Sequence, residues 1–369
     1  MKPSELTIEI VAEKMQFMDT NELQQFSCNM SRHFKPTRKR MVKGKVREID
    51  ALYSSPKRRL KKLHRFLQKT FPPHPSVHGG APLHSCFTSA QKHLNKKFVI
   101  TRDIQACYPS ISPSNLKDYL RKVGFTEPVS HALSLLMTVH GRVAQGSPIS
   151  GDALNLLLCD ADQHIASVAI KAGLRYTRTY DDMVISGNDF TKKRFAERLL
   201  EEQISAHGLQ ISATKAKRNG FQPHTKEQLV HSLVVNNGLG VKLNAKYQEK
   251  ARVLAEKYVR AARCVDQDSI LGVALSRRIV VGHLQHTRQA EFGPAKHIKR
   301  CIKIGDRFVE RKLVSVGLGA HRLRWWLISS KKNTPARLSM LWGRRTTAAP
   351  SIGVTFNLES RGERTCSTN

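Results

Sequence analysis

Residues 175–186 have the sequence RYTRTYDDMVIS, in which two adjacent acids, Asp181 and Asp182, separate two runs of strand-forming residues. The runs 175–180 and 183–186 predict the arms of a β-hairpin with both acids at its tip. A third acid, Asp103, ends another strand-like run, FVITRD at 98–103. The turn QGSP, at 145–148, lies between these segments. The pattern therefore predicts neighbouring strand ends that bring three carboxylates into one small volume.

Three carboxylates in this arrangement suit two Mg²⁺ ions, because Mg²⁺ prefers hard oxygen ligands and keeps several of its waters. Two such ions, roughly 3.5–4 Å apart, hold the attacking and leaving oxygens of a phosphoryl transfer in line and neutralise its charge. An Asp-Asp pair in a turn is more often structural when it stands alone. The order of Asp103, the QGSP turn and the Asp181-Asp182 pair favours the catalytic centre of a nucleotide polymerase.

The composition indicates a polyanionic partner. The chain has 369 residues, with 62 Lys and Arg against 29 Asp and Glu, a formal net charge of +33 and a pI near 10.3. Nucleic acid is the commonest polyanion, and an anionic membrane surface is the alternative. No apolar stretch approaches the ~20 residues of a membrane helix, and the N-terminal residues lack the apolar core of a signal peptide. We expect a cytoplasmic protein with no membrane partner.

The seven cysteines are scattered and never spaced as CxxC, so neither a zinc site nor a disulfide framework is expected. Hydrophobic periodicity predicts a mixture of helices and strands, in an α+β chain. Helices are predicted at 56–69, 114–123, 129–139, 152–171 and 191–207, a short strand at 209–211, and hairpins with turns at 43–45 and within 233–243. The chain beyond residue 246 is predicted to be mostly helical and basic, and its last segment to be a loose tail.

Several blocks resemble those of reverse transcriptases, in the correct order and spacing. RDIQACYPSI (102–111) is similar to the first catalytic block of that family, QGSPISGDALNLL (145–157) to QGxPxSPxLxN, and YTRTYDDMVIS (176–186) to the YxDD block. GLQISATKAK (208–217) resembles the block that supplies a lysine. The resemblance runs from about residue 33 to 285. It implies a right-hand polymerase: a lead-in at 1–32, fingers at 33–97, a palm at 98–228 with fingers helices at 114–140, the palm end and helical thumb at 229–330, and a tail at 331–369.

Within that family the chain is most similar to bacterial retron-type enzymes. SAQKHLNKKFVITRDI resembles their NAxxH segment, and VHSLVVNNGLGVKL (230–243) their VTGLVV segment. The second segment is associated with recognition of structured RNA in retrons. The resemblance therefore assigns RNA binding to four residues: His93, His231, Ser232 and Leu233.

The resemblance also assigns the remaining roles. Asp103 and Asp181 bind both metals and Asp182 assists them. Tyr108 stands where the family places an aromatic ring that excludes a ribose 2′-hydroxyl, with an ordinary core tyrosine as the alternative. Gln145 and Gly146 would lie beside the template–nucleotide pair, where a glycine permits close backbone approach.

Three basic residues would face the triphosphate. Lys215 would protonate the leaving pyrophosphate, with a solvated surface lysine as the alternative. Arg47 and Lys45 would grip the phosphates from the fingers, since guanidinium suits phosphate oxygens, with general backbone binding as the alternative.

Six residues depart from the family pattern. The YxDD block has Thr179 in the usual tyrosine position and Tyr180 in the variable one. Gly151 follows Ser150 where the family has proline. Ser89 replaces the asparagine of NAxxH, and His231-Ser232 replaces the Thr-Gly of VTG.

The resulting hypothesis is an RNA-directed DNA polymerase that uses two Mg²⁺ ions, or Mn²⁺ in their place, and dNTPs. A retron-type enzyme would copy its own structured noncoding RNA from an RNA 2′-hydroxyl, giving a branched RNA–DNA product (msDNA), in antiphage defence with an effector protein encoded nearby. The alternatives are another bacterial reverse transcriptase, of the abortive-infection or group II intron type, and a catalytically idle RNA-binding protein on the same fold.

Overall fold

A computed structural model describes residues 1–42, 45–213, 220–238, 240–264, 270–290 and 293–315. The chain forms two compact units, one of residues 1–252 with 283–297, and one of residues 253–282 with those from 298 onward. The predicted tail at 331–369 lies outside the described residues. Among the helices of the described ranges, none combines the length and the apolar character that crossing a membrane requires.

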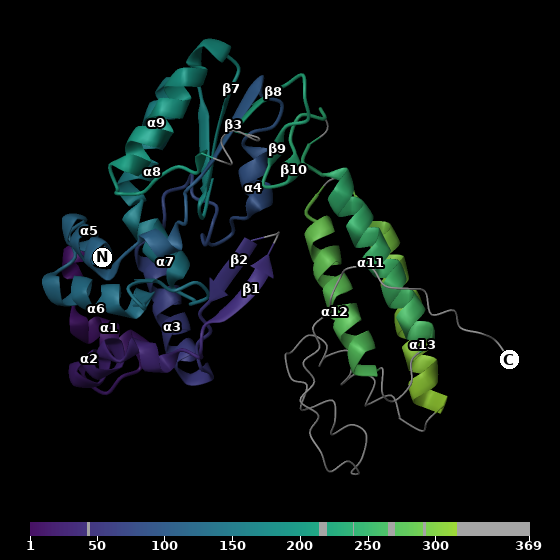
Figure 1. Ribbon diagram of the computed structural model, residues 1–369, viewed down its shortest axis with the longest axis horizontal. Coiled ribbons are helices and arrows are strands. Elements are labelled where there is room, and N and C mark those ends of the chain that lie inside the picture. The colour runs from purple at the N-terminus through teal and green to yellow at the C-terminus, as the bar shows by residue number, and fades with distance from the viewer. Residues whose placement is uncertain (43–44, 214–219, 239, 265–269, 291–292, 316–369) are drawn as a thin grey trace. The chain divides into compact units, whose positions relative to one another are not determined.

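A four-stranded antiparallel sheet organises the first unit, in the order β6-β7-β3-β8. Figure 1 labels three of its strands, β7, β3 and β8. Its strands are β3 (Phe98–Asp103), β6 (Arg175–Thr179), β7 (Asp182–Gly187) and β8 (Phe221–Pro223). The predicted strand at 98–103 and the predicted hairpin are confirmed. Segment 209–211 makes a single bridge, Ile211 to Ile104, rather than a strand.

The two faces of this sheet carry different residues because side chains alternate along each strand. Phe98, Ile100 and Ile185 pack into the main core, against α8 (Cys159–Lys171) and α9 (Lys193–Ser205). Val99 and Val184 pack on the opposite face, in a smaller core with α4 (Cys86–Gln91). The even-numbered residues of β3 and the odd-numbered residues of β7 thus face α8 and α9.

Three short strands lie near α4: β9 (Leu229–Val230), β10 (Leu233–Val234) and β11 (Lys242–Leu243), in the order β11-β10-β9. The predicted hairpin within 233–243 is therefore present, although each arm has only two residues. Val230, Leu233 and Leu243 are buried in the smaller core.

Helices and a second hairpin surround the sheet. The helices are α1 (Ile8–Met15), α2 (Thr20–Cys28), α3 (Ser54–Thr70), α5 (Pro113–Lys122), α6 (Glu127–Met137) and α7 (Ser150–Leu157). The basic hairpin pairs β1 (Arg38–Val42) with β2 (Lys45–Ile49), and residues 43–44 of its predicted turn lie outside the described ranges. The predicted helix α3 buries Leu60, Leu63 and Leu67 on one side, as its spacing indicated.

Two helix predictions need correction. The predicted helix 152–171 is two helices, α7 and α8, separated at Leu158, whose backbone (φ −100°, ψ 12°) leaves the helical region. The predicted helix 129–139 ends at Met137, because Thr138–Val139 forms β4 and pairs with β5 (Arg142–Val143). Both pieces of the first helix bury apolar residues, so its hydrophobic pattern gave no sign of the break.

The second unit is helical, as expected, and is formed by parts of α11 (Ala245–Arg263), α12 (Ile270–Thr287) and α13 (Ala295–Ser315). Asp306 joins these three helices. It accepts hydrogen bonds from the Tyr258 hydroxyl at 2.6 Å and from Arg277 Nε at 2.7 Å. Gly305 allows α13 to approach α11, since a Cβ there would lie 2.4 Å from the Tyr258 ring.

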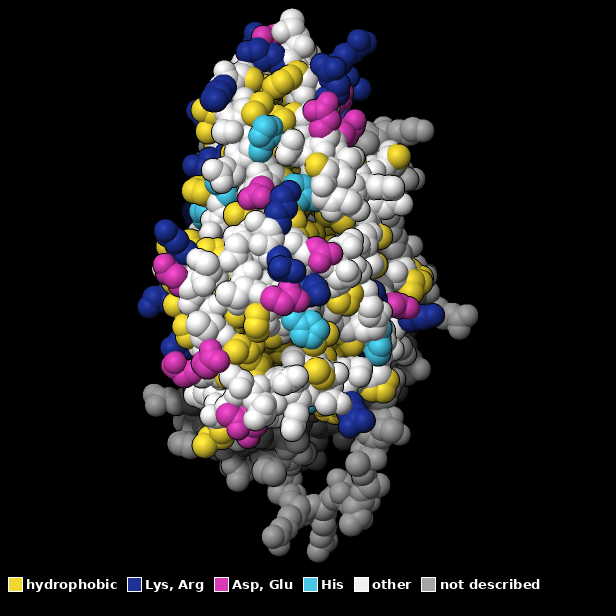
Figure 2. Space-filling view, turned by 90° about the vertical axis from the view of Figure 1, so that its left-hand side faces the viewer, with side chains coloured by type: hydrophobic (Ala, Val, Ile, Leu, Met, Phe, Trp, Pro, Cys, Tyr) yellow, Lys and Arg dark blue, Asp and Glu magenta, His cyan; other side chains and the backbone are white. Residues whose placement is uncertain are grey.

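Basic side chains are exposed in more than one part of the described surface. On the face shown in Figure 2, Lys and Arg side chains lie scattered among acidic and apolar ones. Basic side chains are also exposed along α3, at Lys57, Arg58, Lys61 and Lys69. A distributed charge of this kind suits sequence-independent contact with a phosphate backbone.

Candidate metal centre

The tip of the β6–β7 hairpin brings the three predicted acids together. Asp103 lies directly opposite Asp182 across the β3–β7 pair, and Asp181 occupies the two-residue turn. Each acid offers one carboxylate oxygen, and the three oxygens lie within 4.8 Å of one another. Asp103 is buried, whereas the Asp182 side chain is about half exposed, at 50%. The cluster is therefore anchored in the sheet at one side and open to solvent at the other.

This donor set fits divalent cations such as Mg²⁺. All three side chains are hard oxygen donors, and an exposed edge leaves room for waters and for phosphate oxygens. The sheet register holds Asp103 and Asp182, and the backbone N–H of Ile104 donates to the Asp181 carbonyl at 3.0 Å, which ties the turn to β3. The backbone thus places the carboxylates before any ion binds.

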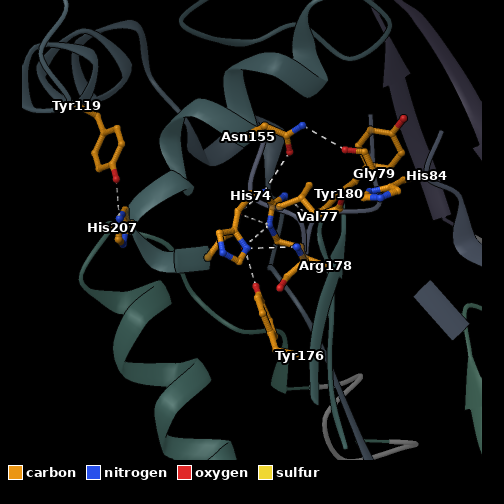
Figure 3. Close-up of polar contacts among 12 residues, drawn as sticks. His74, Val77, Gly79, His84, Tyr119, Asn155, Tyr176, Arg178, Tyr180 and His207 are labelled. Atoms are coloured by element: carbon orange, nitrogen blue, oxygen red, sulfur yellow. Dashed lines mark hydrogen bonds and ion pairs between the residues drawn. The ribbon is translucent and has the colours of Figure 1, made fainter. Parts of the chain in front are cut away.

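A buried arginine fixes the hairpin from the face covered by α8. Arg178 is fully buried and donates from Nη2 to Asp162 Oδ2 at 2.6 Å, from Nη2 to Asn155 Oδ1 at 3.1 Å and from Nη1 to the Tyr180 carbonyl at 2.9 Å. Tyr176 donates its hydroxyl to Asp162 Oδ1 at 2.8 Å. Figure 3 shows Asn155, Tyr176 and Arg178 near one another.

The carboxylate of Asp162 favours the charged form of Arg178. Burial alone would lower the pKa of Arg178, but the Asp162 carboxylate outweighs it and raises that pKa above its ordinary value. Sequence reasoning did not predict Arg178 or Asp162 as important. The available signal was a charged residue at a core-facing position of a strand, two residues after Tyr176.

The backbone of Tyr180, in the turn at the hairpin tip, has a positive φ of +55°. Its ring lies close to Gly80 and Gly151. A Cβ on Gly79 would lie 2.2 Å from the Tyr180 nitrogen, and a Cβ on Gly151 would lie 3.3 Å from the Tyr180 ring. Asn155 donates to the Gly79 carbonyl at 3.1 Å, which holds the loop at 71–85 against the tip (Figure 3). Tyr180 and Gly151, two of the departures noted in the sequence, are therefore neighbours in space.

The opposite face of the sheet carries a chain of buried polar side chains. His93 contacts Ser186 Oγ through Nδ1 at 2.7 Å and Thr177 Oγ1 through Nε2 at 2.8 Å. Ser89 Oγ lies 2.7 Å from Thr177 Oγ1 and 3.0 Å from His231 Nε2. Burial lowers the pKa of His93 to about 3, so its ring is neutral at physiological pH.

These positions correct part of the predicted RNA-binding set. His93 is fully buried with both ring nitrogens in hydrogen bonds, and Leu233 is 1% exposed in the smaller core. Direct RNA contact through these two side chains does not fit this placement. His231 is mostly buried and Ser232 is exposed, with φ values of +51° and +68°.

The QGSP turn is bound to the base of the β1–β2 hairpin through Asp50. Gln145 N–H donates to Asp50 Oδ2 at 2.9 Å, and Arg142 donates to the same carboxylate at 2.7 Å. A Cβ on Gly146 (φ +121°) would lie 2.8 Å from the Asp50 carbonyl. The close approach predicted for Gly146 thus exists here toward Asp50. Asp50 itself was not singled out, although it is a rare acid in a basic segment.

The structure describes the remaining predicted residues to different extents. Tyr108 is partly buried next to the core, and burial, together with the charges of Cys107 and Asp181, raises its pKa, so its hydroxyl stays protonated. The backbones of Lys45 and Arg47 lie in β2, and their side chains are outside what the structure describes. Lys215 also lies outside the described residues, but Ser212, three residues earlier, donates its N–H to the Asp103 carbonyl at 2.8 Å.

Sequence comparison relates the chain to retron reverse transcriptases. No family model matches the chain. It is 28% identical over 229 residues to the retron Mx65 reverse transcriptase of Myxococcus xanthus, covering 54% of this chain and 53% of that protein. It is 26% identical over 174 residues to the retron Ec86 reverse transcriptase of Escherichia coli, covering 47% and 50%. The chain thus spans about half the length of the relatives that it matches.

Similar solved structures include a telomerase from Candida albicans in complex with a TWJ fragment of telomeric RNA, with a TM-score of 0.40 and 11% identity over 87% of this chain and 69% of that one. A foamy viral protease–reverse transcriptase in complex with double-stranded DNA gives a TM-score of 0.37 and 12% identity, over 74% of this chain and 44% of that one.

Proposed function

We propose that this chain, which is a homologue of retron reverse transcriptases over about half of its length, is an RNA-directed DNA polymerase. Its mixture of helices and strands agrees with the predicted α+β class, and the sheet β6-β7-β3-β8 would form the palm of a right-hand polymerase. The observation that carries the proposal is the cluster of Asp103, Asp181 and Asp182, whose oxygens lie within 4.8 Å of one another. The division into fingers, palm and thumb stays a prediction.

The proposed reaction adds one deoxynucleotide to a primer. The hydroxyl at the primer end loses its proton to solvent, its oxygen forms a bond to the α-phosphorus of a dNTP, the bond from that phosphorus to the bridging oxygen breaks, and pyrophosphate leaves. Two Mg²⁺ ions, when bound, would neutralise the charge on the transferring phosphate and align its oxygens. Asp103 and Asp181 would hold both ions, and Asp182 would hold one of them more weakly.

Residues around the cluster would orient the nucleotide. Tyr108 stands five residues after Asp103 and packs against the main core, and its ring would lie beneath the incoming sugar. There the ring would exclude a 2′-hydroxyl and select dNTPs. Gln145, whose N–H is held by Asp50, and Gly146 would lie beside the template–nucleotide pair.

Phosphate contacts complete this part of the proposal. Arg47 and Lys45 on β2 would contact the triphosphate. Lys215, which follows a segment attached to Asp103, would donate a proton to the leaving pyrophosphate.

The relatives support a retron-type role. Such an enzyme would copy a structured noncoding RNA from an RNA 2′-hydroxyl and release a branched RNA–DNA product. An effector protein encoded nearby and a role in antiphage defence would complete the system. The net charge of +33 supports a nucleic-acid partner, because Lys and Arg neutralise backbone phosphates without reading sequence.

Primer extension by the purified chain tests the proposal. The wild type should extend a DNA primer on an RNA template with dNTPs and Mg²⁺, and Asp181→Asn should lower the rate by about a thousandfold or more, since the metals supply most of the charge stabilisation. Lys171→Gln, on the exposed surface of α8, is the matched control and should leave the rate unchanged. A wild type that binds RNA but adds no nucleotide would support the idle RNA-binding alternative instead.

Expression with the native flanking DNA separates the retron type from other bacterial reverse transcriptases. A retron-type enzyme should yield a short single-stranded DNA that is covalently joined to RNA, shortened by RNase and absent with Asp181→Asn. Primer extension without such a product would keep the polymerase activity and reject the retron type.

A further inference from the structure

We propose that His231 is a positioning residue for Asp182, held by a one-directional hydrogen-bond chain that begins at Ser186 and orients the His231 Nδ1–H toward the acid. This inference rests on the proposed function for its catalytic consequence, but its structural part stands alone. It concerns the two segments in which the chain departs from the retron pattern, at Ser89 and at His231.

The chain of contacts is continuous and enclosed. It runs from Ser186 to His93, Thr177, Ser89 and His231, with neighbouring polar atoms 2.7, 2.8, 2.7 and 3.0 Å apart. The first four side chains are at most 1% exposed. His231 Nδ1 then lies 3.9 Å from Asp182 Oδ2. Buried polar groups are costly unless they are paired, so this chain should have one well-defined set of donors and acceptors.

The buried end at Ser186 sets the direction. His93 is neutral, so only one of its nitrogens carries a proton. If Nδ1 carried it, Ser186 would accept that proton, and its own hydroxyl proton would have no acceptor among the contacts of the described residues. If Ser186 donates to His93 Nδ1, both groups are satisfied. His93 Nε2–H then donates to Thr177.

The remaining links follow from this first one, because each hydroxyl has a single proton to donate. Thr177 accepts from His93 and so donates to Ser89. Ser89 accepts from Thr177 and so donates to His231 Nε2. With Nε2 accepting a hydrogen bond, a neutral His231 carries its proton on Nδ1, which faces the carboxylate of Asp182.

The open end at Asp182 favours the same direction. The reverse chain would present the lone pair of His231 Nδ1 to a carboxylate, which is electrostatically unfavourable. The forward chain presents an N–H, which attracts Asp182 directly after a small movement or through one water. Both ends of the chain therefore select the same tautomer.

Ser89 and His231 are thus a matched pair. The retron pattern has asparagine and threonine at these positions, whereas this chain has a small hydroxyl beside an imidazole, 3.0 Å apart. The Asp182 side chain is 50% exposed, whereas Asp103 is buried, so Asp182 depends on neighbours for its orientation. Partners of metal-binding carboxylates commonly affect metal affinity or activity by about 10–100-fold when removed.

The tautomer of His231 can be measured without metal, nucleotide or activity. Long-range ¹H–¹⁵N correlation on protein labelled with ¹⁵N-histidine, assigned with His231→Asn, should show the Nδ1–H form at pH 7.5. The Nε2–H form, or protons on both nitrogens, would overturn the proposed direction. Ser89→Ala should remove the preference for Nδ1–H, and Ser167→Ala, whose hydroxyl bonds only within α8, should not.

Kinetics test the positioning role. Ser89→Ala should lower kcat of primer extension about tenfold and raise the Mg²⁺ concentration for half-maximal rate, with KM for dNTP changed less than about twofold. His231→Asn, whose amide can replace the Nδ1–H, should retain most of kcat, whereas His231→Gln should lose about tenfold. Equal rates for the asparagine and glutamine variants would overturn the role.

The double variant Ser89→Asn with His231→Thr restores the retron pair and should be more active than His231→Thr alone. Equal activity of the two would show that the residues act independently and would overturn the matched pair. If the wild type adds no nucleotide at all, the proposed function fails, and the tautomer measurement still decides the orientation of His231.

Discussion

Removing Arg178 should destabilise the protein severely, because its partner would be left charged inside the core. Arg178→Met keeps the volume of the side chain and deletes its hydrogen bonds to Asp162, Asn155 and the Tyr180 carbonyl. Asp162 is 1% exposed and would retain only the hydroxyl of Tyr176, at 2.8 Å.

The size of the effect follows from this burial. Breaking a buried ion pair by removing one partner typically costs about 3–5 kcal/mol. With about 2.1 cal/mol/K of unfolding entropy per residue, each kcal/mol lowers the unfolding midpoint of a chain of this length by about 1.3 °C, so Arg178→Met should lower Tm by roughly 4–7 °C. The double variant with Asp162→Leu removes the stranded charge and should recover much of that loss, leaving about 1–3 kcal/mol for the unpaired Tyr176 hydroxyl.

Thermal unfolding followed by circular dichroism measures both variants. Arg178→Met should also lower the rate of primer extension below its Tm, since the Tyr180 carbonyl at the hairpin tip loses its donor. A Tm within 2 °C of wild type, or a double variant less stable than Arg178→Met, would refute the reasoning.

Three other perturbations have definite outcomes. Gly79→Ala should lower stability by about 1–3 kcal/mol in urea unfolding, because its Cβ would lie 2.2 Å from the hairpin-tip backbone, whereas Gly272→Ala, with no atom within 4 Å, should not. Hydrogen bonding to Asp152 raises the pKa of His64. The pair therefore stabilises the fold fully below the pKa of His64 in the unfolded chain, and this stabilisation is lost as the pH rises through the pKa of His64 in the folded chain. His64→Gln should destabilise the protein more at pH 6 than at pH 9, and an equal loss at both pH values would contradict this. Asp50→Asn should lower stability by about 1–3 kcal/mol in urea unfolding and raise KM for dNTP, because the buried side chain loses one of the oxygens that accept hydrogen bonds from Gln145 and Arg142. An unchanged urea midpoint and an unchanged KM would be the contrary result.

The sequence was sufficient to predict the hairpin and its acids. The run 98–103 and the two arms around Asp181-Asp182 have strand periodicity, and their registry brings Asp103 opposite Asp182. Local pattern carries this information because each strand is short and the acids mark its end. The same holds for α3, whose apolar spacing matches its buried face.

The residues that hold the hairpin in place could not be predicted, because their contacts join segments that are distant in the sequence. Arg178 and Asp162 lie on a strand and on the preceding helix, and nothing local indicates that they meet. His93 was assigned to RNA contact because its motif was recognised, whereas tertiary packing encloses it beneath the sheet. The break at Leu158 has no glycine or proline to mark it, so the pattern predicted one helix where there are two.

The central claim is that residues from β3 and from the hairpin tip bind the same metal ions. Replacing Mg²⁺ with Fe²⁺, in the presence of ascorbate and peroxide, generates hydroxyl radicals that cut the backbone next to a bound ion. The account predicts two cuts, one near Asp103 and one near Asp181, which excess Mg²⁺ suppresses. Asp103→Asn alone should weaken both cuts, because one ion would contact both segments. Two cuts that respond independently to Asp103→Asn and Asp181→Asn, or no cut at either position, would contradict a shared metal centre.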